Sequence, residues 1–185
     1  MTGQRARQMI ARKIPVVRLD YPKHWFLVGA MLWAAATSIF IYLSLTSVEP
    51  FSRAFWAAVA AVEAPVVFVM FVLPVFTSHA AGAKGLRLRM GVLLREDVPY
   101  EWIRSVDETS IRWGGVRVGV GVRYAAITQA LFVTSSFRNL IEIELDGEHR
   151  LGGLLKRPVR RIVMSVRSAE RAAELLRERA ELPKE

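Results

Sequence analysis

Glu63 is the acidic residue with the most unusual setting, because it is the single charge in an apolar stretch from Ala54 to Ser78. A carboxylate inside a membrane span costs roughly 2.5–3.5 kcal/mol on insertion scales and usually faces a partner, a cavity or water. Glu63 could therefore bind a proton or cation, or contact a partner subunit. The alternative is a structural glutamate that is hydrogen-bonded to Thr37, Ser38 or a neighbouring chain.

Basic residues form a second set of candidates. The planar guanidinium group of arginine suits phosphate, and arginines on neighbouring strands could together bind the headgroup of an anionic lipid. The residues proposed for this lipid or phosphate site are Lys84, Arg87, Arg89, Arg112, Arg117 and Arg123. The alternative is that they are solvated strand faces, or that they supply only general attraction to an anionic membrane surface.

Other chemistry is poorly represented in the sequence. There is no cysteine, which removes disulfides, thiolate zinc sites and cysteine nucleophiles. His24, His79 and His149 have no second ligand at metal-binding spacing, and Ser135 and Ser136 lack the glycines of a nucleophile elbow. We therefore expect no enzyme activity, no metal and no cofactor. We also expect no nucleic-acid partner, since the basic cluster at residues 156–161 is not part of a recognised nucleic-acid motif.

Two apolar stretches must position Glu63. The 24 residues from Trp25 to Val48 carry no charge, and as a helix they would cross a hydrocarbon core of roughly 30 Å. The second stretch, residues 54–78, is of similar length, and residues 49–53 would form the link between the two. The sequence therefore predicts a transmembrane helical hairpin over residues 24–79, preceded by a basic segment (1–23) and followed by a charged domain (80–185).

The distribution of charge predicts the orientation of this hairpin. Basic residues dominate before the first span and directly after the second, whereas the link holds only Arg53 against Glu49. Positively charged flanks favour the cytoplasmic side, so both termini should be cytoplasmic. The alanines at positions 34–36, 57–58 and 60–61 would let helices approach closely, which favours a protein partner or a homo-oligomer.

The charged domain has the pattern of half-buried strands. Apolar and polar residues alternate over 86–90 and 116–122, and further apolar strands are predicted at 130–134, 140–145 and 162–166. Asp146-Gly147 is a preferred type I′ turn dipeptide, which predicts a hairpin that returns through residues 149–151. A final helix should begin after an N-cap at Ser168 and bury Ala169, Ala172, Ala173, Leu176 and Ala180.

The order of these elements resembles the bacterial pleckstrin-homology-like domain. The resemblance covers roughly residues 84–182 and rests on Gly85–Gly91 with Val98–Val106, on the Trp/Gly/Arg-rich segment Trp113–Tyr124, and on the terminal strand and helix. It implies a strongly bent sheet or partial barrel of seven strands, closed at one end by the C-terminal helix. It implies no shared catalytic residue.

The sequence thus predicts an α+β membrane protein with a two-helix hairpin and a pleckstrin-homology-like domain. We expect non-enzymatic work in scaffolding, assembly or sensing at the cytoplasmic leaflet. One alternative is an accessory subunit of a transporter or membrane enzyme complex that uses Glu63. The other is a module that binds anionic lipid headgroups through the arginine-bearing strands.

Overall fold

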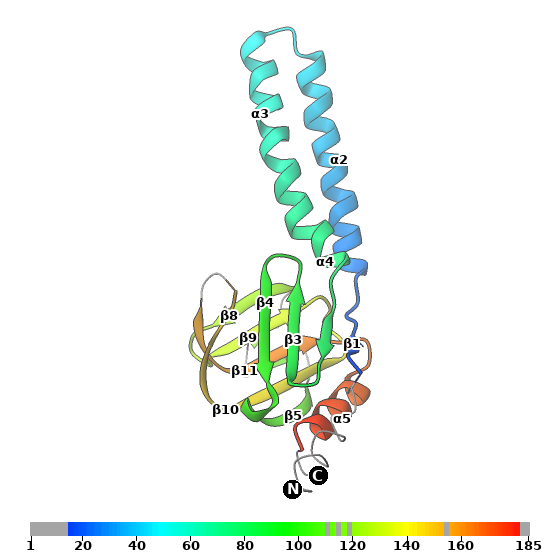
Figure 1. Cartoon of the computed structure of the whole chain (residues 1–185). Coiled ribbons are helices and arrows are strands. Elements are labelled where there is room, and N and C mark those ends of the chain that lie inside the picture. The colour runs from blue at the N-terminus through cyan, green and yellow to red at the C-terminus, as the bar shows by residue number, and fades with distance from the viewer. Residues whose placement is uncertain (1–14, 110–111, 114–115, 118–119, 154–155, 182–185) are drawn as a thin grey trace, which may run out of the picture.

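The computed structural model describes residues 15–109, 112–113, 116–117, 120–153 and 156–181. Two long antiparallel helices project from one end of a domain built of β-sheets, and a short helix lies at the other end of that domain (Figure 1). The chain is therefore α+β, with the helical hairpin preceding most of the strands.

The hairpin consists of α2 (His24–Thr46) and a second helix that begins as α3 (Pro50–Val67). Both helices are long and apolar enough to cross a membrane. The link is shorter and earlier than the predicted segment 49–53, because Pro50 already belongs to the first turn of α3. Proline is favoured there since its fixed φ suits a helix and the first turn needs no N–H donor.

The second helix widens before it ends. After α3 the chain forms a π-helical turn, η1 (Phe68–Val72), and a last turn, α4 (Leu73–Val75). Pro74 lies two residues after this widened turn, and a proline can neither donate to the preceding turn nor fit against the carbonyl group four residues earlier. The π turn accommodates that constraint, with the Leu73 N–H bonded to the carbonyl oxygen of Phe68.

The first sheet joins the two ends of the hairpin. Its order is β1 (Val17–Leu19), β2 (His79–Ala81), β3 (Gly85–Met90) and β4 (Leu94–Pro99), with every pair antiparallel. In β1 and β2, Leu19 lies opposite His79 and Val17 opposite Ala81. Residues that precede the first long helix and residues that follow the second are therefore neighbours in one sheet, a pairing that the sequence did not indicate.

The second sheet has five strands in the order β5-β10-β11-β9-β8. A 3-10 turn, η2 (Tyr100–Trp102), leads from β4 into β5 (Ile103–Thr109). The pair β9–β11 is parallel and the other pairs are antiparallel. Among the described residues, β6 (Arg112–Trp113) and β7 (Val116–Arg117) form a separate small pair. The bounds of the remaining strands are β8 (Gly121–Ala125), β9 (Ala130–Thr134), β10 (Leu140–Leu151) and β11 (Arg157–Ser165).

Most of the predicted strands are confirmed. The segments 86–90 and 130–134 match β3 and β9, and 162–165 falls in β11, which begins five residues earlier than expected. The predicted strand 116–122 is divided between β7 and β8, and residues 118–119 of it lie outside the described residues.

The predicted turn at Asp146-Gly147 is wrong. β10 runs through both residues and pairs with β11 on either side of them, first as Glu144 with Arg161 and then as His149 with Val159. The dipeptide lies in an irregularity of the ladder, and the chain reverses later, where Gly152 and Gly153 have φ of 115° and 67°. Two glycines with positive φ satisfy the reversal better than an Asp-Gly pair inside a continuous strand.

The two larger sheets bury one shared core. It includes Leu86, Leu88 and Met90 from β3 and Ile141 and Ile162 from the second sheet. Within the described part of the chain neither sheet closes into a barrel.

The terminal helix α5 (Ala169–Arg179) lies at the end of the domain away from the hairpin (Figure 1). It buries Ala169, Ala172, Ala173 and Leu176, as predicted, and Ala180 is partly buried. Ser168 occupies the N-cap position but its hydroxyl group makes no capping hydrogen bond. The C-terminal turn of the helix is held to the sheets, where Arg177 donates to the Val106 carbonyl oxygen and Arg179 donates to the carbonyl oxygens of Ala81 and Gly82.

Candidate functional site

Glu63 makes one side-chain contact across the helical hairpin. The hydroxyl oxygen of Thr37 on α2 lies 3.3 Å from Oε2 of Glu63. Thr37 is one of the hydrogen-bond partners that the sequence suggests for Glu63. Ser38 instead donates to the carbonyl oxygen of Ala34 in its own helix. Oε1 of Glu63 is buried and has no hydrogen-bond partner among the described residues.

Thr37 has more acceptors than its single proton can serve. Its hydroxyl oxygen also lies 3.0 Å from the carbonyl oxygen of Trp33. A hydroxyl group donates one hydrogen bond at a time, so Thr37 cannot donate to Trp33 and to Glu63 together. The carboxyl group of Glu63 is therefore incompletely satisfied within the hairpin.

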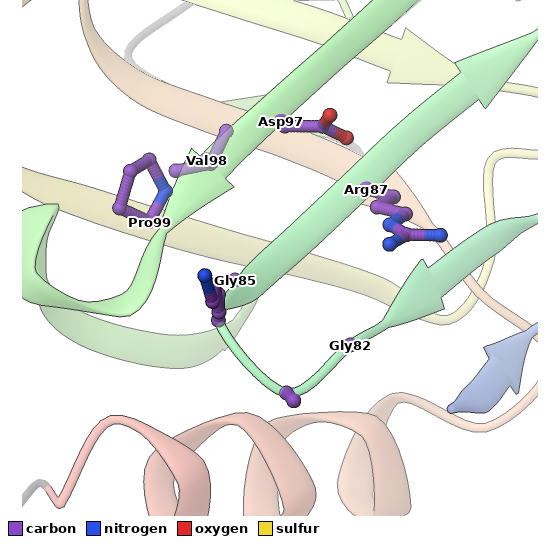
Figure 2. Close-up of a pocket in the computed structure, with 8 residues that line it drawn as sticks. Gly82, Gly85, Arg87, Asp97, Val98 and Pro99 are labelled. Atoms are coloured by element: carbon purple, nitrogen blue, oxygen red, sulfur yellow. The ribbon is translucent and has the colours of Figure 1, made fainter. Parts of the chain in front are cut away.

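Lys84 and Arg87, two of the predicted basic residues, line one pocket. This pocket of about 440 Å³ lies at the turn between β2 and β3 and the end of β4. Figure 2 shows Arg87 and Asp97 on neighbouring strands beside it, and the two residues are register partners. Asp97 lines the same pocket, and its negative charge reduces the attraction of the pocket for a phosphate group. The turn also lies beside α5, at the end of the domain away from the hairpin (Figure 1).

The other predicted basic residues lie elsewhere. The guanidinium group of Arg89 lies 3.2 Å from Asp97, in an exposed ion pair. Arg112 and Arg117 are register partners in the small pair β6–β7. Arg123 is exposed on β8, at the edge of the second sheet, where it lines a different cavity. The five arginines are thus divided among three sheets, and Lys84, in the β2–β3 turn, shares a pocket with Arg87.

A polar cluster at the base of the hairpin was not anticipated. The hydroxyl group of Tyr21, which precedes α2, donates to the carbonyl oxygen of Pro74 at 2.6 Å and lies 2.9 Å from the hydroxyl oxygen of Thr77. Thr77 in turn accepts the backbone N–H of Gly91 in the β3–β4 turn, at 2.8 Å. These bonds connect both ends of the hairpin to the first sheet. No motif marks Tyr21 or Thr77 in the sequence, because the cluster exists only once β1 and β2 have paired.

His79 is the most deeply buried titratable residue of this cluster. Its side chain is 0% exposed, Nδ1 accepts the backbone N–H of Arg89 at 3.1 Å, and Nε2 has no partner among the described residues. The ring of Tyr21 packs against it, with 4.9 Å between ring centroids. Burial lowers the pKa of His79 to about 3, because the charged form would lose its hydration. The imidazole is therefore neutral and acts as a hydrogen-bond acceptor within the sheet.

A second polar contact joins the two sheets. Glu96 on β4 is only 6% exposed, and its Oε1 accepts the backbone N–H of Gly153 at 2.8 Å and the ammonium group of Lys156 at 2.7 Å. Both donors belong to the reversal between β10 and β11. The contact fixes that reversal against the β3–β4 hairpin, close to the base of the helices.

Comparison of the chain with protein-family models, with curated proteins and with solved structures gives no match. Among the described residues, no group of three His, Asp or Glu side chains is close enough to hold a metal ion. The functional argument therefore depends on the geometry of the hairpin, its base and the sheets.

Proposed function

We propose that the chain is an integral membrane protein that holds a pleckstrin-homology-like domain at the cytoplasmic surface, where it works without catalysis as a scaffold or assembly factor. The hairpin would cross the bilayer, and the domain would present its exposed strands and turns to a protein partner. The observation that carries this proposal is the pairing of β1 with β2 across the two ends of the hairpin.

That pairing supports a rigid connection between anchor and domain. Leu19 and His79 are opposite one another in the sheet, and Tyr21 is hydrogen-bonded to Pro74 at the base of α4. A flexible linker would let the domain move independently of its anchor, whereas paired strands and a buried cluster fix its distance and tilt. A scaffold gains from a fixed geometry because a partner then meets a defined surface.

The surface of the hairpin supports the membrane location. In the most apolar windows of the two helices only 6% and 17% of the residues are buried, and large side chains such as Leu32, Leu45 and Phe51 are exposed. The core helix of a water-soluble protein would be largely covered. An apolar surface of this extent needs a lipid or protein environment.

A topology experiment tests the membrane part of the proposal. The chain has no cysteine, so single cysteines can be introduced as Val48→Cys in the hairpin link and Ile127→Cys in the β8–β9 turn, two sites that are 93% and 99% exposed. In intact cells a membrane-impermeant maleimide should label Val48→Cys, and it should label Ile127→Cys only after lysis. Labelling of both sites from the same side would refute a spanning hairpin.

A co-purification experiment tests the scaffold part. Ile127 is a fully exposed apolar side chain at the tip of the β8–β9 turn, and such a residue is well suited to a protein contact. We expect full-length protein purified from its host in mild detergent to carry a stoichiometric partner that is lost in Ile127→Asp and retained in Arg138→Ala, a matched exposed site. A wild-type chain that purifies without any stoichiometric protein would contradict a scaffold role.

A second candidate function is an accessory subunit of a membrane transporter or enzyme, favoured by the unpartnered Oε1 of Glu63. A polar side chain of another subunit could complete its hydrogen bonding. In that case Glu63→Gln should reduce the activity of the larger complex, and it should leave the Ile127-dependent partner in place. Unchanged activity of the complex in Glu63→Gln would exclude this candidate.

A further inference from the structure

The base of the hairpin holds the cavity that Arg123 lines, apart from the pocket at Lys84 and Arg87. It has a volume of about 460 Å³, within the usual range for small-molecule sites. The helices contribute Phe26, Met70 and Phe71, the β3–β4 turn contributes Leu93, and the start of β8 contributes Val122 and Arg123. The cavity thus lies between the anchor and the two sheets of the domain and is partly open to the outside.

The helical wall of this cavity is fixed by packing. Met70 and Phe71 belong to the π-helical turn η1, a type of irregularity that is frequent at functional sites. The ring of Phe71 rests directly on Gly29 of α2, where a Cβ atom would overlap it. Phe71 also packs against the main core and lies 6.4 Å from the ring of Trp33. The Phe71 wall of the cavity is therefore held by contacts within the chain itself.

The cavity lies at the depth where headgroups meet acyl chains. Phe26 is the third residue of α2, and Phe71 lies four residues before the end of α4. At 1.5 Å per residue both side chains enter roughly 3–6 Å inside the helix ends. In a spanning hairpin this depth corresponds to the edge of the hydrocarbon core, so a lipid of the same leaflet could reach the cavity sideways.

The charge of the lining distinguishes this cavity from the pocket at Lys84 and Arg87. Arg123 is the only charged residue among the described residues that line it, and it has no ion pair with the described part of the chain. In the other pocket Asp97 opposes Arg87. An apolar chamber with one unopposed arginine suits an amphiphile with an apolar chain and an anionic group.

We propose that this cavity binds one anionic phospholipid of the cytoplasmic leaflet, with an acyl chain against Phe26, Phe71 and Val122 and the phosphate on Arg123. This inference rests on the proposed membrane insertion but not on the scaffold role. It also replaces the strand-face site predicted for headgroups, because the apolar contacts supply most of the affinity and Arg123 supplies the preference for negative charge. The bound lipid would then contact both the helices of the anchor and the strands of the domain.

Native mass spectrometry of the full-length chain in mild detergent tests the proposal, with phosphatidylglycerol and phosphatidylcholine of matched chains as probes. Wild-type protein should retain one phosphatidylglycerol per chain and prefer it over phosphatidylcholine by about fivefold, the effect of one basic residue near an anionic lipid. Glycerol phosphate, which has no acyl chain, should not displace it.

Four variants, one of them a control, separate the contributions. Val122→Trp and Leu93→Phe should fill the cavity and abolish retention of both lipids, and two variants are used because one of them could fail to fold. Arg123→Gln should keep a bound lipid but lose the preference for phosphatidylglycerol. Arg171→Gln removes an exposed arginine from α5, at the other end of the domain, and should match wild type.

Two results would overturn the lipid site: retention that is equal in wild type and in both folded cavity-filling variants, or a preference that survives in Arg123→Gln. Either result leaves the cysteine-labelling and co-purification experiments unaffected. Conversely, failure to find a protein partner would leave the lipid measurement valid. The two proposals therefore fail separately.

Discussion

The hydroxyl group of Tyr21 donates a 2.6 Å hydrogen bond to the carbonyl oxygen of Pro74, 53 positions later in the sequence. Tyr21 precedes the first long helix and Pro74 lies in the last turn of the second. Pro74 ends the helix and cannot itself donate a hydrogen bond, but its carbonyl group remains available for the tyrosine. This bond closes the base of the hairpin.

Tyr21→Phe should loosen that base. The change removes the bonds to Pro74 and Thr77 while it keeps the ring against His79 and Phe26, so we expect a loss of about 1–2 kcal/mol in the free energy of unfolding. Thermal unfolding in detergent measures it. Tyr42→Phe, at an exposed site on α2, is the control, and an equal effect of both variants would refute a special role for Tyr21.

The stability of the domain should fall in acid because of His79. Its pKa is about 3 in the folded chain, against about 6.5 when unfolded, so between these values the unfolded chain binds the extra proton. The contribution is complete above pH 6.5 and is lost as the pH falls towards 3, by up to roughly 1.4 kcal/mol per pH unit.

His79→Gln isolates this effect. Glutamine can still accept the N–H of Arg89 but does not titrate, and the carboxyl groups common to both proteins cancel in the difference. Denaturant unfolding at pH 7, 6 and 5 should show a gap between wild type and variant that changes with pH. A gap that is constant with pH would contradict burial of a neutral imidazole.

Gly153 in the β10–β11 reversal and Gly147 within β10 should respond differently to replacement by alanine. Gly153 has φ of +67°, and a Cβ there would lie 2.7 Å from the carbonyl oxygen of Leu93, so Gly153→Ala should cost about 1–3 kcal/mol. Gly147 has open space around it and no positive φ. Gly147→Ala should stay within about 0.5 kcal/mol of wild type by thermal unfolding. A large loss of stability in Gly147→Ala would instead support the turn that the sequence predicts at Asp146-Gly147.

The contact between Glu63 and Thr37 gives a prediction inside the hairpin. In Glu63→Gln the amide group can donate to the Thr37 hydroxyl oxygen while Thr37 donates to Trp33, so stability should change by less than about 0.5 kcal/mol. Thr37→Val leaves the carboxyl group without its partner and should cost about 1–2 kcal/mol. Thermal unfolding of the full chain measures both. Thr46→Val, which loses only a bond to Tyr42 in its own helix, should have less effect than Thr37→Val.

Local patterns predicted the elements of this protein well. The long apolar runs indicated both helices, because in lipid a single segment satisfies its own backbone hydrogen bonds only as a helix. Alternation indicated β3, a continuous apolar run indicated β9, and the spacing of Ala169, Ala172, Ala173 and Leu176 indicated the buried face of α5. These signals are local, so they can be recognised in the sequence without knowledge of the tertiary structure.

Long-range pairing could not be predicted in the same way. β1 has only three residues and pairs with a strand on the far side of the hairpin, and nothing in Val17–Leu19 marks that partner. The burial of His79 follows from this pairing, as does the Tyr21 cluster. The candidate arginines shared a pattern of alternation, but that pattern could not show that Arg87 faces Asp97 or that Arg123 belongs to another sheet.

The pairing of β1 with β2 also constrains the order in which the chain can fold during synthesis. Residues 17–19 leave the ribosome first, yet their partners at 79–81 follow only after both long helices have been made. Until then the edge of β2 that β1 covers does not exist, and β1 waits as an unpaired segment beside a newly made apolar hairpin. In a spanning hairpin, insertion of both helices on the correct side thus becomes a checkpoint for completing the first sheet. A chain that inserted only one helix would place β1 and β2 on opposite sides of the membrane, and its domain would remain open at that edge and recognisable to a protease.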